Sequence, residues 1–219
     1  VEITATSADT STAATTFTVA VTDIDEFDVS TPTDSDTTAD TVAENAADDT
    51  AVGVTGSASD ADGSTNTITW AMTSGTTACD DFFDIGSSDG IVRVDGTSEM
   101  DYETVTSCDI TVTATSADTS TATSATISVA ITDIDEFDVS TPTDSDSTAD
   151  TVAENAADNT AVGVTGSASD ADGSTNTITW TMTSGTTACD DFFDIGSSDG
   201  IVRVDGTSEM DYETVTSCD

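Results

Sequence analysis

The sequence repeats itself with a period of about 110 residues. Residues 91–109 recur letter for letter as residues 201–219, and the segment that follows Asp109 resembles the segment that begins at Val1. This period is the size of one β-sandwich domain. The repeat predicts that Val1 continues a strand of the kind that Asp219 begins, so a neighbouring copy is expected to complete the second unit.

The repeat divides the chain into three segments. Residues 1–26 are interpreted as the last two strands and linker of a preceding or neighbouring-copy domain. Residues 27–136 are predicted to form one complete domain, and residues 137–219 a second domain that lacks its last two strands. The copies are either continuous in one polypeptide or separate subunits that exchange strands, and the sequence leaves both arrangements open.

Short runs of β-branched residues alternate with Thr and Ser, and turn residues separate the runs, which predicts an all-β fold. No stretch has helical periodicity. In the strand that contains Trp70, apolar residues recur at every second position, and Trp70 is expected to anchor the core. The expected strands of the complete domain are 41–44, 51–57, 66–72, 82–85, 91–94, 105–115 and 125–132.

The chain is extremely acidic: 44 Asp and Glu against 2 Arg give a formal net charge of -42. Arg93 and Arg203 cannot neutralise phosphates, so nucleic acid and anionic membranes are excluded as partners. No apolar segment is long enough to insert into a membrane. A low content of large apolar residues combined with a high net charge is typical of disordered chains. The regular strand pattern argues instead for a fold that needs cations for stability.

Four cysteines recur at one spacing, with Cys79 and Cys108 29 positions apart, as are Cys189 and Cys218. The spacing favours one disulfide per repeat; the alternative is two unpaired buried thiols per unit. A disulfide implies an oxidising, extracellular location. A loop of this length contributes about 3–4 kcal/mol on the chain-entropy model.

Acidic residues gather in four recurring motifs, around Glu44, around Asp60 and Asp62, around Asp101, and in the run that begins at Asp133. The spacing of Asp60 and Asp62, with Gly63 next, suits a tight loop that brings two carboxylates together. Ca²⁺ takes six to eight oxygen ligands, which such loops can supply jointly. The alternative reading of an acidic run is a solvated face. We expect a solvated face for Asp80, Asp81, Asp84 and Asp89. A second acidic segment could line a further Ca²⁺ loop, but we favour a solvated loop for Asp34, Asp36 and Asp40.

The order of these motifs, Ala-Glu-Asn, Asp-Ala-Asp-Gly, Asp-Tyr-Glu and Asp-Ile-Asp-Glu, resembles the cadherin repeat in its bacterial, cadherin-like form. The resemblance covers nearly the whole chain and implies tandem Greek-key, Ig-like β-sandwiches. It also implies Ca²⁺ between consecutive domains. The family's linker usually ends in Asn, whereas this chain has Phe27 and Phe137, which we hypothesised to plug the bottom of the next sandwich.

By this resemblance each junction has its own ligand set. The junction within the chain would use Glu44, Asp101, Glu103, Asp133, Asp135, Glu136, Asp170 and Asp172, with Asp9 supplied by the following copy. The junction at the start would use Asp23, Asp25, Glu26, Asp60, Asp62 and Asp118, with Glu154, Asp211 and Glu213 from the copy before.

The sequence therefore predicts a structural repeat of an extracellular Ca²⁺-stiffened fibre or adhesin stalk, with copies joined head to tail. The alternative is an adhesive module that recognises a glycan or protein on another surface. An enzyme is not expected: His is absent, and paired carboxylates of the glycosidase kind lack an aromatic cleft. Abundant Ser and Thr suggest O-linked glycans as a further hypothesis.

Overall fold

The computed structural model describes residues 1–96, 99–185, 187–189, 191–206 and 210–219. Its contacts divide the chain into two compact units. Unit 1 comprises Val1–Asp101 and Val105–Thr132, and unit 2 comprises Tyr102–Thr104 and Asp133–Asp219. Strands dominate both, and among the described residues no helix is long and apolar enough to cross a membrane.

The first sheet of unit 1 has four antiparallel strands in the order β3 (Thr33–Asp34), β5 (Ala51–Ser57), β8 (Ile91–Val94) and β7 (Phe83–Ile85). The register between β5 and β8 shifts between Ala51 and Thr55, where Gly53 has a φ of 88°. A side chain there would collide with the carbonyl of Ala39, so the bulge requires glycine.

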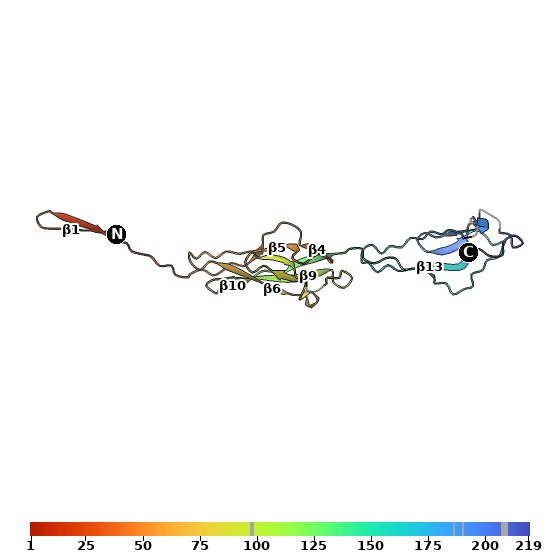
Figure 1. Ribbon diagram of the computed structural model, residues 1–219, viewed down its shortest axis with the longest axis horizontal. Helices are drawn as coiled ribbons and strands as arrows, with labels where there is room; N and C mark the ends of the chain where they lie inside the picture. Colours follow the sequence, from red (N-terminus) through yellow and green to blue (C-terminus); the bar gives the residue numbers. More distant parts are fainter. Residues whose placement is uncertain (97–98, 186, 190, 207–209) are drawn as a thin grey trace. The chain divides into compact units, whose positions relative to one another are not determined.

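The second sheet of unit 1 is organised around β9 (Ser107–Ser116) (Figure 1). Residues of β9 pair on one edge with β6 (Ile68–Ser74) and on the other with β10 (Thr121–Thr123) and β11 (Ile127–Thr132). β4 (Thr41–Ala43) adds to β11 in parallel. Every other strand of this sheet is therefore held directly or indirectly by β9.

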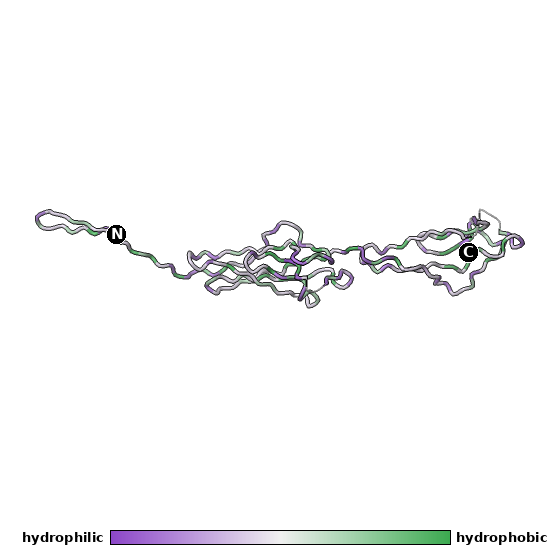
Figure 2. The backbone as a smooth tube through the Cα atoms, viewed as in Figure 1, coloured by the Kyte–Doolittle hydropathy of each residue, from purple (hydrophilic) through white to green (hydrophobic). Residues whose placement is uncertain are grey.

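The core of unit 1 lies between these sheets. Alternate residues of β9 are buried while their neighbours are more exposed, the period of two that the sequence predicts. Figure 2 shows apolar and polar residues interleaved along these strands. The disulfide between Cys79 and Cys108 forms as predicted. The fully buried aliphatic side chains are Val52, Val54, Val92, Ile110, Val112 and Val129.

The N-terminal hairpin of the chain is different. β1 (Glu2–Thr6) and β2 (Thr12–Thr16) pair antiparallel, and every residue in both strands is exposed. The apolar residues around them, including Ile3 and Phe17, contribute to no buried core. An isolated two-stranded hairpin is only marginally stable in water.

The described residues of unit 2 form a four-stranded sheet in the order β12 (Thr143–Asp144), β13 (Ala161–Ser167), β15 (Ile201–Val204) and β14 (Phe193–Ile195). It corresponds strand for strand to the first sheet of unit 1. Val162, Val202 and Val204 form its small buried cluster. The second predicted disulfide, between Cys189 and Cys218, is also present.

Two expectations about aromatic residues need correction. Trp70 is only half-buried, because β6 lies at the edge of its sheet, although its ring packs so closely on Gly56 that a Cβ there would lie 2.7 Å from Trp70 Cζ3. The hypothesis that Phe27 and Phe137 plug a sandwich is wrong. Their side chains are 55 % and 48 % exposed, while their backbone N–H groups donate to the loop carboxylates of Asp62 and Asp172.

Candidate metal centres

Unit 1 brings together three carboxylates from distant parts of the sequence. One oxygen each of Asp25, Asp62 and Asp118 lies within 4.8 Å of the others. Oxygens bound to one Ca²⁺ at 2.3–2.6 Å can lie up to about 5 Å apart, so this spacing fits a shared ion. Without an ion, carboxylates this close repel by roughly 4 kcal/mol per pair at an effective dielectric of 20.

Asp62 is the structural centre of this cluster. It is 3 % exposed, and its two oxygens accept the backbone N–H groups of Glu26 at 3.2 Å and Phe27 at 3.1 Å. Its own N–H donates to Asp60 Oδ1 at 3.0 Å, and the hydroxyl of Ser116 donates to Asp60 Oδ2. The Asp-Ala-Asp-Gly loop therefore fixes the linker backbone and holds one carboxylate beneath it.

The carboxylates of this cluster are partly desolvated and repel one another, which raises pKa values within it. Partial desolvation, then the neighbouring Asp62 and Asp118, raise the pKa of Asp25 to about 6, although the residue as a whole is exposed. Desolvation, then Asp62, also raises the pKa of Glu26. The cation-free cluster thus favours protons, and a divalent cation would relieve the same repulsion.

Unit 2 contains a similar arrangement around the Asp133–Phe137 linker. One oxygen each of Glu103, Asp133 and Glu136 lies within 4.8 Å of the others. Ser174 donates its backbone N–H to Asp133 Oδ2 at 2.8 Å, and its hydroxyl donates to the same oxygen. The other oxygen of Asp133 is buried and receives no donor from the described residues.

Asp172 lies beneath this linker as Asp62 does in unit 1. It is 1 % exposed, and Oδ1 accepts the N–H groups of Glu136 at 3.1 Å and Phe137 at 3.3 Å. Oδ2 is buried, and no donor among the described residues reaches it. Burial raises the pKa of Asp172, but the backbone N–H donors of Glu136 and Phe137 and the side-chain contacts with Asp135 and Asp170 together lower it, so the net shift is downward. Contact with Asp172 raises the pKa of Asp135.

Gly173 makes the approach of the Asp-Tyr-Glu motif possible within unit 2. Its N–H donates to Glu103 Oε1 at 2.7 Å. A Cβ on Gly173 would lie 2.6 Å from the ring of Tyr102. Any larger residue would push Glu103 away from the linker carboxylates, which explains why this loop carries glycine.

A third cluster of Glu154, Asp211 and Glu213 also has oxygens within 4.8 Å, but all three residues are exposed. The N–H of Tyr212 donates to Glu154 Oε2 at 2.9 Å, which ties the two motifs together. The Ala-Glu-Asn and Asp-Tyr-Glu motifs thus meet within unit 2.

The remaining predicted ligands lie outside these groups or in separate units. Glu44 is buried in unit 1, 5 % exposed, and its N–H donates to the carbonyl of Thr132. Asp170 Oδ1 accepts the N–H of Asp172, and Asp23 accepts the hydroxyl of Ser64. Asp9 is exposed and accepts the N–H and the hydroxyl of Ser11, and Asp101 is exposed in unit 1.

The serines that follow each Asp-Ala-Asp-Gly motif were not predicted to belong to the sites. Ser64 and Ser174 hold the first linker carboxylate, and Ser116 holds Asp60. The signal was available, because both repeats place Ser directly after the glycine. Asp34 and Asp36, by contrast, use their oxygens on nearby N–H groups and show a capped loop.

No protein-family model matches the chain, and no characterised protein sequence matches it. Solved structures do match. The EC3–6 cis-dimer structure of protocadherin gammaB7 has a TM-score of 0.68 at 19 % identity, over 96 % of this chain and 50 % of that chain. Mouse cadherin-23 EC22–24 has a TM-score of 0.61 at 21 % identity, over 86 % of this chain and 57 % of that chain.

These likenesses show the fold: the chain has the β-sandwich architecture of tandem cadherin extracellular domains. The chain spans about half the length of the structures it matches.

Proposed function

We propose that the chain is a structural repeat of an extracellular fibre or adhesin stalk, stiffened by Ca²⁺ and built from copies joined head to tail. The observation that carries the proposal is Asp172. It is an almost completely buried carboxylate with one oxygen that accepts no hydrogen bond from any described residue, and it lies beneath a linker whose carboxylates crowd together. Buried carboxylates are normally hydrogen-bonded, paired or bound to metal.

Ca²⁺ suits these groups better than other cations do. Every candidate ligand is an oxygen, and His is absent from the chain. Hard oxygen sites with several carboxylates favour Ca²⁺ in flexible geometry, whereas Mg²⁺ retains most of its water. The ligand set that we propose combines the clusters with the order of the motifs: Glu44, Asp101, Glu103, Asp133, Asp135, Glu136, Asp170 and Asp172, with equivalents Asp23, Asp25, Glu26, Asp60, Asp62 and Asp118, and Asp9, Glu154, Asp211 and Glu213 facing neighbouring copies.

Stiffening follows from the charge. Without Ca²⁺ the linker carboxylates repel one another and favour separation of the segments that carry them. With Ca²⁺ the same carboxylates become shared ligands that fix the linker. The disulfide in each unit supports an oxidising, extracellular setting. The many exposed Thr and Ser hydroxyls would accept O-linked glycans in that setting.

Limited proteolysis tests this function. We expect cleavage in Asp133–Phe137 to be at least about tenfold slower in millimolar Ca²⁺ than in chelator, because opening of the linker must precede cleavage. Asp172→Asn should abolish most of this difference. Asp80→Asn, which removes an exposed carboxylate outside the clusters, should preserve it. Equal cleavage rates with Ca²⁺ and with chelator would refute the proposal.

A further inference from the structure

Three consecutive residues of one loop hold different parts of the carboxylate cluster in unit 2. Asp172 accepts two backbone N–H groups of the linker, at 3.1 Å and 3.3 Å. Gly173 donates its N–H to Glu103 Oε1 at 2.7 Å. Ser174 donates to Asp133, the first carboxylate of the linker. The loop therefore positions the linker backbone and two of the clustered carboxylates at once.

Ser174 directs both of its donors to the same oxygen of Asp133. Its backbone N–H donates to Oδ2 at 2.8 Å, and its hydroxyl donates to that oxygen as well. A carboxylate oxygen has two lone pairs, so these two donors use both of them. The other oxygen, Oδ1, is buried and receives no donor from the described residues. Oδ1 is thus the oxygen of Asp133 that has lone pairs for a cation.

A buried carboxylate oxygen without a partner raises the free energy of the cation-free chain, because it has lost its water and gained nothing in return. The same loop contains a second such atom. Asp172 is 1 % exposed, and its Oδ2 is reached by no donor among the described residues. Two unsatisfied oxygens on residues of one loop and its linker indicate a bound ligand and do not fit a solvated acidic face.

Unit 1 repeats the serine contact at its own linker. Ser64 follows the Asp-Ala-Asp-Gly motif as Ser174 does, and its hydroxyl donates to Asp23 Oδ2 at 2.7 Å. Asp23 begins the linker motif of unit 1, as Asp133 begins that of unit 2. Asp23 is exposed, whereas Asp133 is half-buried. The contact is therefore a property of the two motifs and does not depend on how deeply the carboxylate is buried.

We propose that Ser174 is a positioning residue for the cation of unit 2, and that Ser64 has the same role in unit 1. By binding Oδ2 of Asp133, Ser174 fixes the rotation of the carboxylate and reserves Oδ1 for the cation. A ligand that is fixed in advance loses little conformational entropy on binding. The inference rests on the proposed function, because it takes Ca²⁺ as the cation.

The first test is a Ca²⁺ titration of the full chain, followed by NMR at amides that report on each linker. Glu136 and Phe137 report on unit 2, and Glu26 and Phe27 report on unit 1, because these N–H groups donate to the loop carboxylates. Groups that orient metal ligands typically change affinity by about 10- to 100-fold. Ser174→Ala removes the hydroxyl and keeps the N–H donor, so we expect Ca²⁺ binding in unit 2 to weaken about tenfold. Binding in unit 1 should be unchanged.

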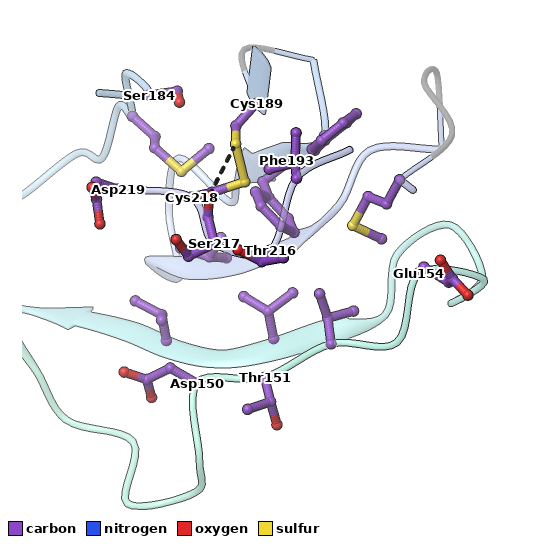
Figure 3. Close-up of a pocket in the computed structure, with 18 of the residues that line it drawn as sticks. Asp150, Thr151, Glu154, Ser184, Cys189, Phe193, Thr216, Ser217, Cys218 and Asp219 are labelled. Carbon is purple, nitrogen blue, oxygen red and sulfur yellow. Dashed lines mark hydrogen bonds between the residues drawn. A yellow bond between two sulfur atoms is a disulfide. The ribbon is translucent and has the colours of Figure 1, made fainter. Parts of the chain in front are cut away.

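A conservative variant and a matched control accompany this titration. Ser174→Thr keeps both donors at an exposed position and should retain the wild-type affinity to within about twofold. Ser217→Ala removes the hydroxyl of another exposed serine of unit 2 and should have no effect. Ser217 lines an apolar groove of about 540 Å³ beside the disulfide of Cys189 with Cys218 (Figure 3) and belongs to none of the carboxylate clusters.

Hydrogen exchange in chelator distinguishes positioning from a purely structural role. The amides of Glu136 and Phe137 donate to Asp172 and not to Asp133, so they report whether the linker stays on the loop. If Ser174 positions Asp133 for the cation, Ser174→Ala should leave this exchange unchanged while the Ca²⁺ affinity falls. Faster exchange in chelator with no loss of affinity would mean that Ser174 only fastens the linker, and would overturn the inference.

The titration also separates this inference from the proposed function. If wild-type chain and Ser174→Ala bind Ca²⁺ in unit 2 equally well, the positioning role is wrong and the calcium proposal stands. If the linker amides of the wild-type chain do not respond to millimolar Ca²⁺, both proposals are refuted. A loss of affinity in Ser174→Ala that Ser174→Thr restores supports both.

Discussion

Units 1 and 2 carry nearly the same sequence and differ in how much of the sandwich they form. The sheet of β3, β5, β8 and β7 has a full counterpart in β12, β13, β15 and β14. The sheet around β9 has no counterpart among the described residues of unit 2. Val52 and Val92 are 0 % exposed in unit 1, whereas Val162 and Val202 are each 8 % exposed in unit 2.

Identical local sequence gives different secondary structure in the two units. Thr41–Ala43 is strand β4, but the same three residues at 151–153 form no strand. Ile68–Ser74 is strand β6, whereas residues 178–184, which differ only in Thr181, form none. These segments need β9 and β11 as hydrogen-bond partners, so their strand structure is tertiary in origin.

The largest difference between the two copies is expected when the same substitution is made at two equivalent positions, Val112 in β9 and Ile3 in β1. Val112→Asn puts an amide without a partner into the core, where Val112 is 1 % exposed, and should destabilise unit 1 by more than about 4 kcal/mol. Ile3→Asn, at the equivalent position in β1, should leave the stability of the dilute chain unchanged. Amide hydrogen exchange across β5, β8 and β9 measures both effects.

Unit 2 provides an internal control in that experiment, because exchange in β13 and β15 should be the same in both variants. If Ile3→Asn lowered protection in unit 1 as much as Val112→Asn does, the hairpin would contribute to that core. The contrast between the buried and exposed copies of this strand would then be wrong.

A smaller effect sharpens the contrast in packing. Val52→Ala leaves a cavity in a closed core and should cost unit 1 about 2 kcal/mol. Val162→Ala removes the same atoms from the floor of an open groove and should cost unit 2 about 1 kcal/mol. Chemical denaturation followed by residue-specific exchange in β5 and β13 would show the two values. Equal losses would mean that unit 2 is closed in solution.

The smallest predicted effect is one that should not differ between the units. Arg93 binds Asp89 at 2.8 Å, and Arg203 binds Asp199 at 2.7 Å. In each pair the guanidinium lowers the pKa of the carboxyl below 3.8. The stability that each pair gives is present above that value and lost only as the pH falls through the lowered pKa.

Carboxyl titration by NMR should therefore give matching midpoints for Asp89 and Asp199, both below 3.8. Arg93→Gln should raise the midpoint of Asp89 and leave that of Asp199 unchanged. A difference between the two wild-type midpoints would show that the looser packing of unit 2 alters even the β14–β15 hairpin, which carries Asp199 and Arg203.

Much of the fold was predictable because it is encoded locally. The alternation in 51–57 and 91–94 gives β5 and β8 with the predicted bounds, and the cysteine spacing gives both disulfides. The resemblance assigned Asp25, Asp62 and Asp118 to one ligand set, and one oxygen of each lies within 4.8 Å of the others. Sequence could not show that Trp70 lies at a sheet edge or that Phe27 is exposed, because both depend on neighbouring backbone.

By itself the sequence determined an acidic, disulfide-linked β-sandwich repeat with carboxylates at recurring loops, since alternation, spacing and charge are properties of short segments. Only the tertiary structure decided which copy of each strand is buried, because a strand is stable when a partner satisfies its backbone and covers its apolar face. Val112 and Ile3 occupy the same place in the repeat. Val112 is enclosed between two sheets, whereas Ile3 lies on a hairpin whose strands are exposed throughout.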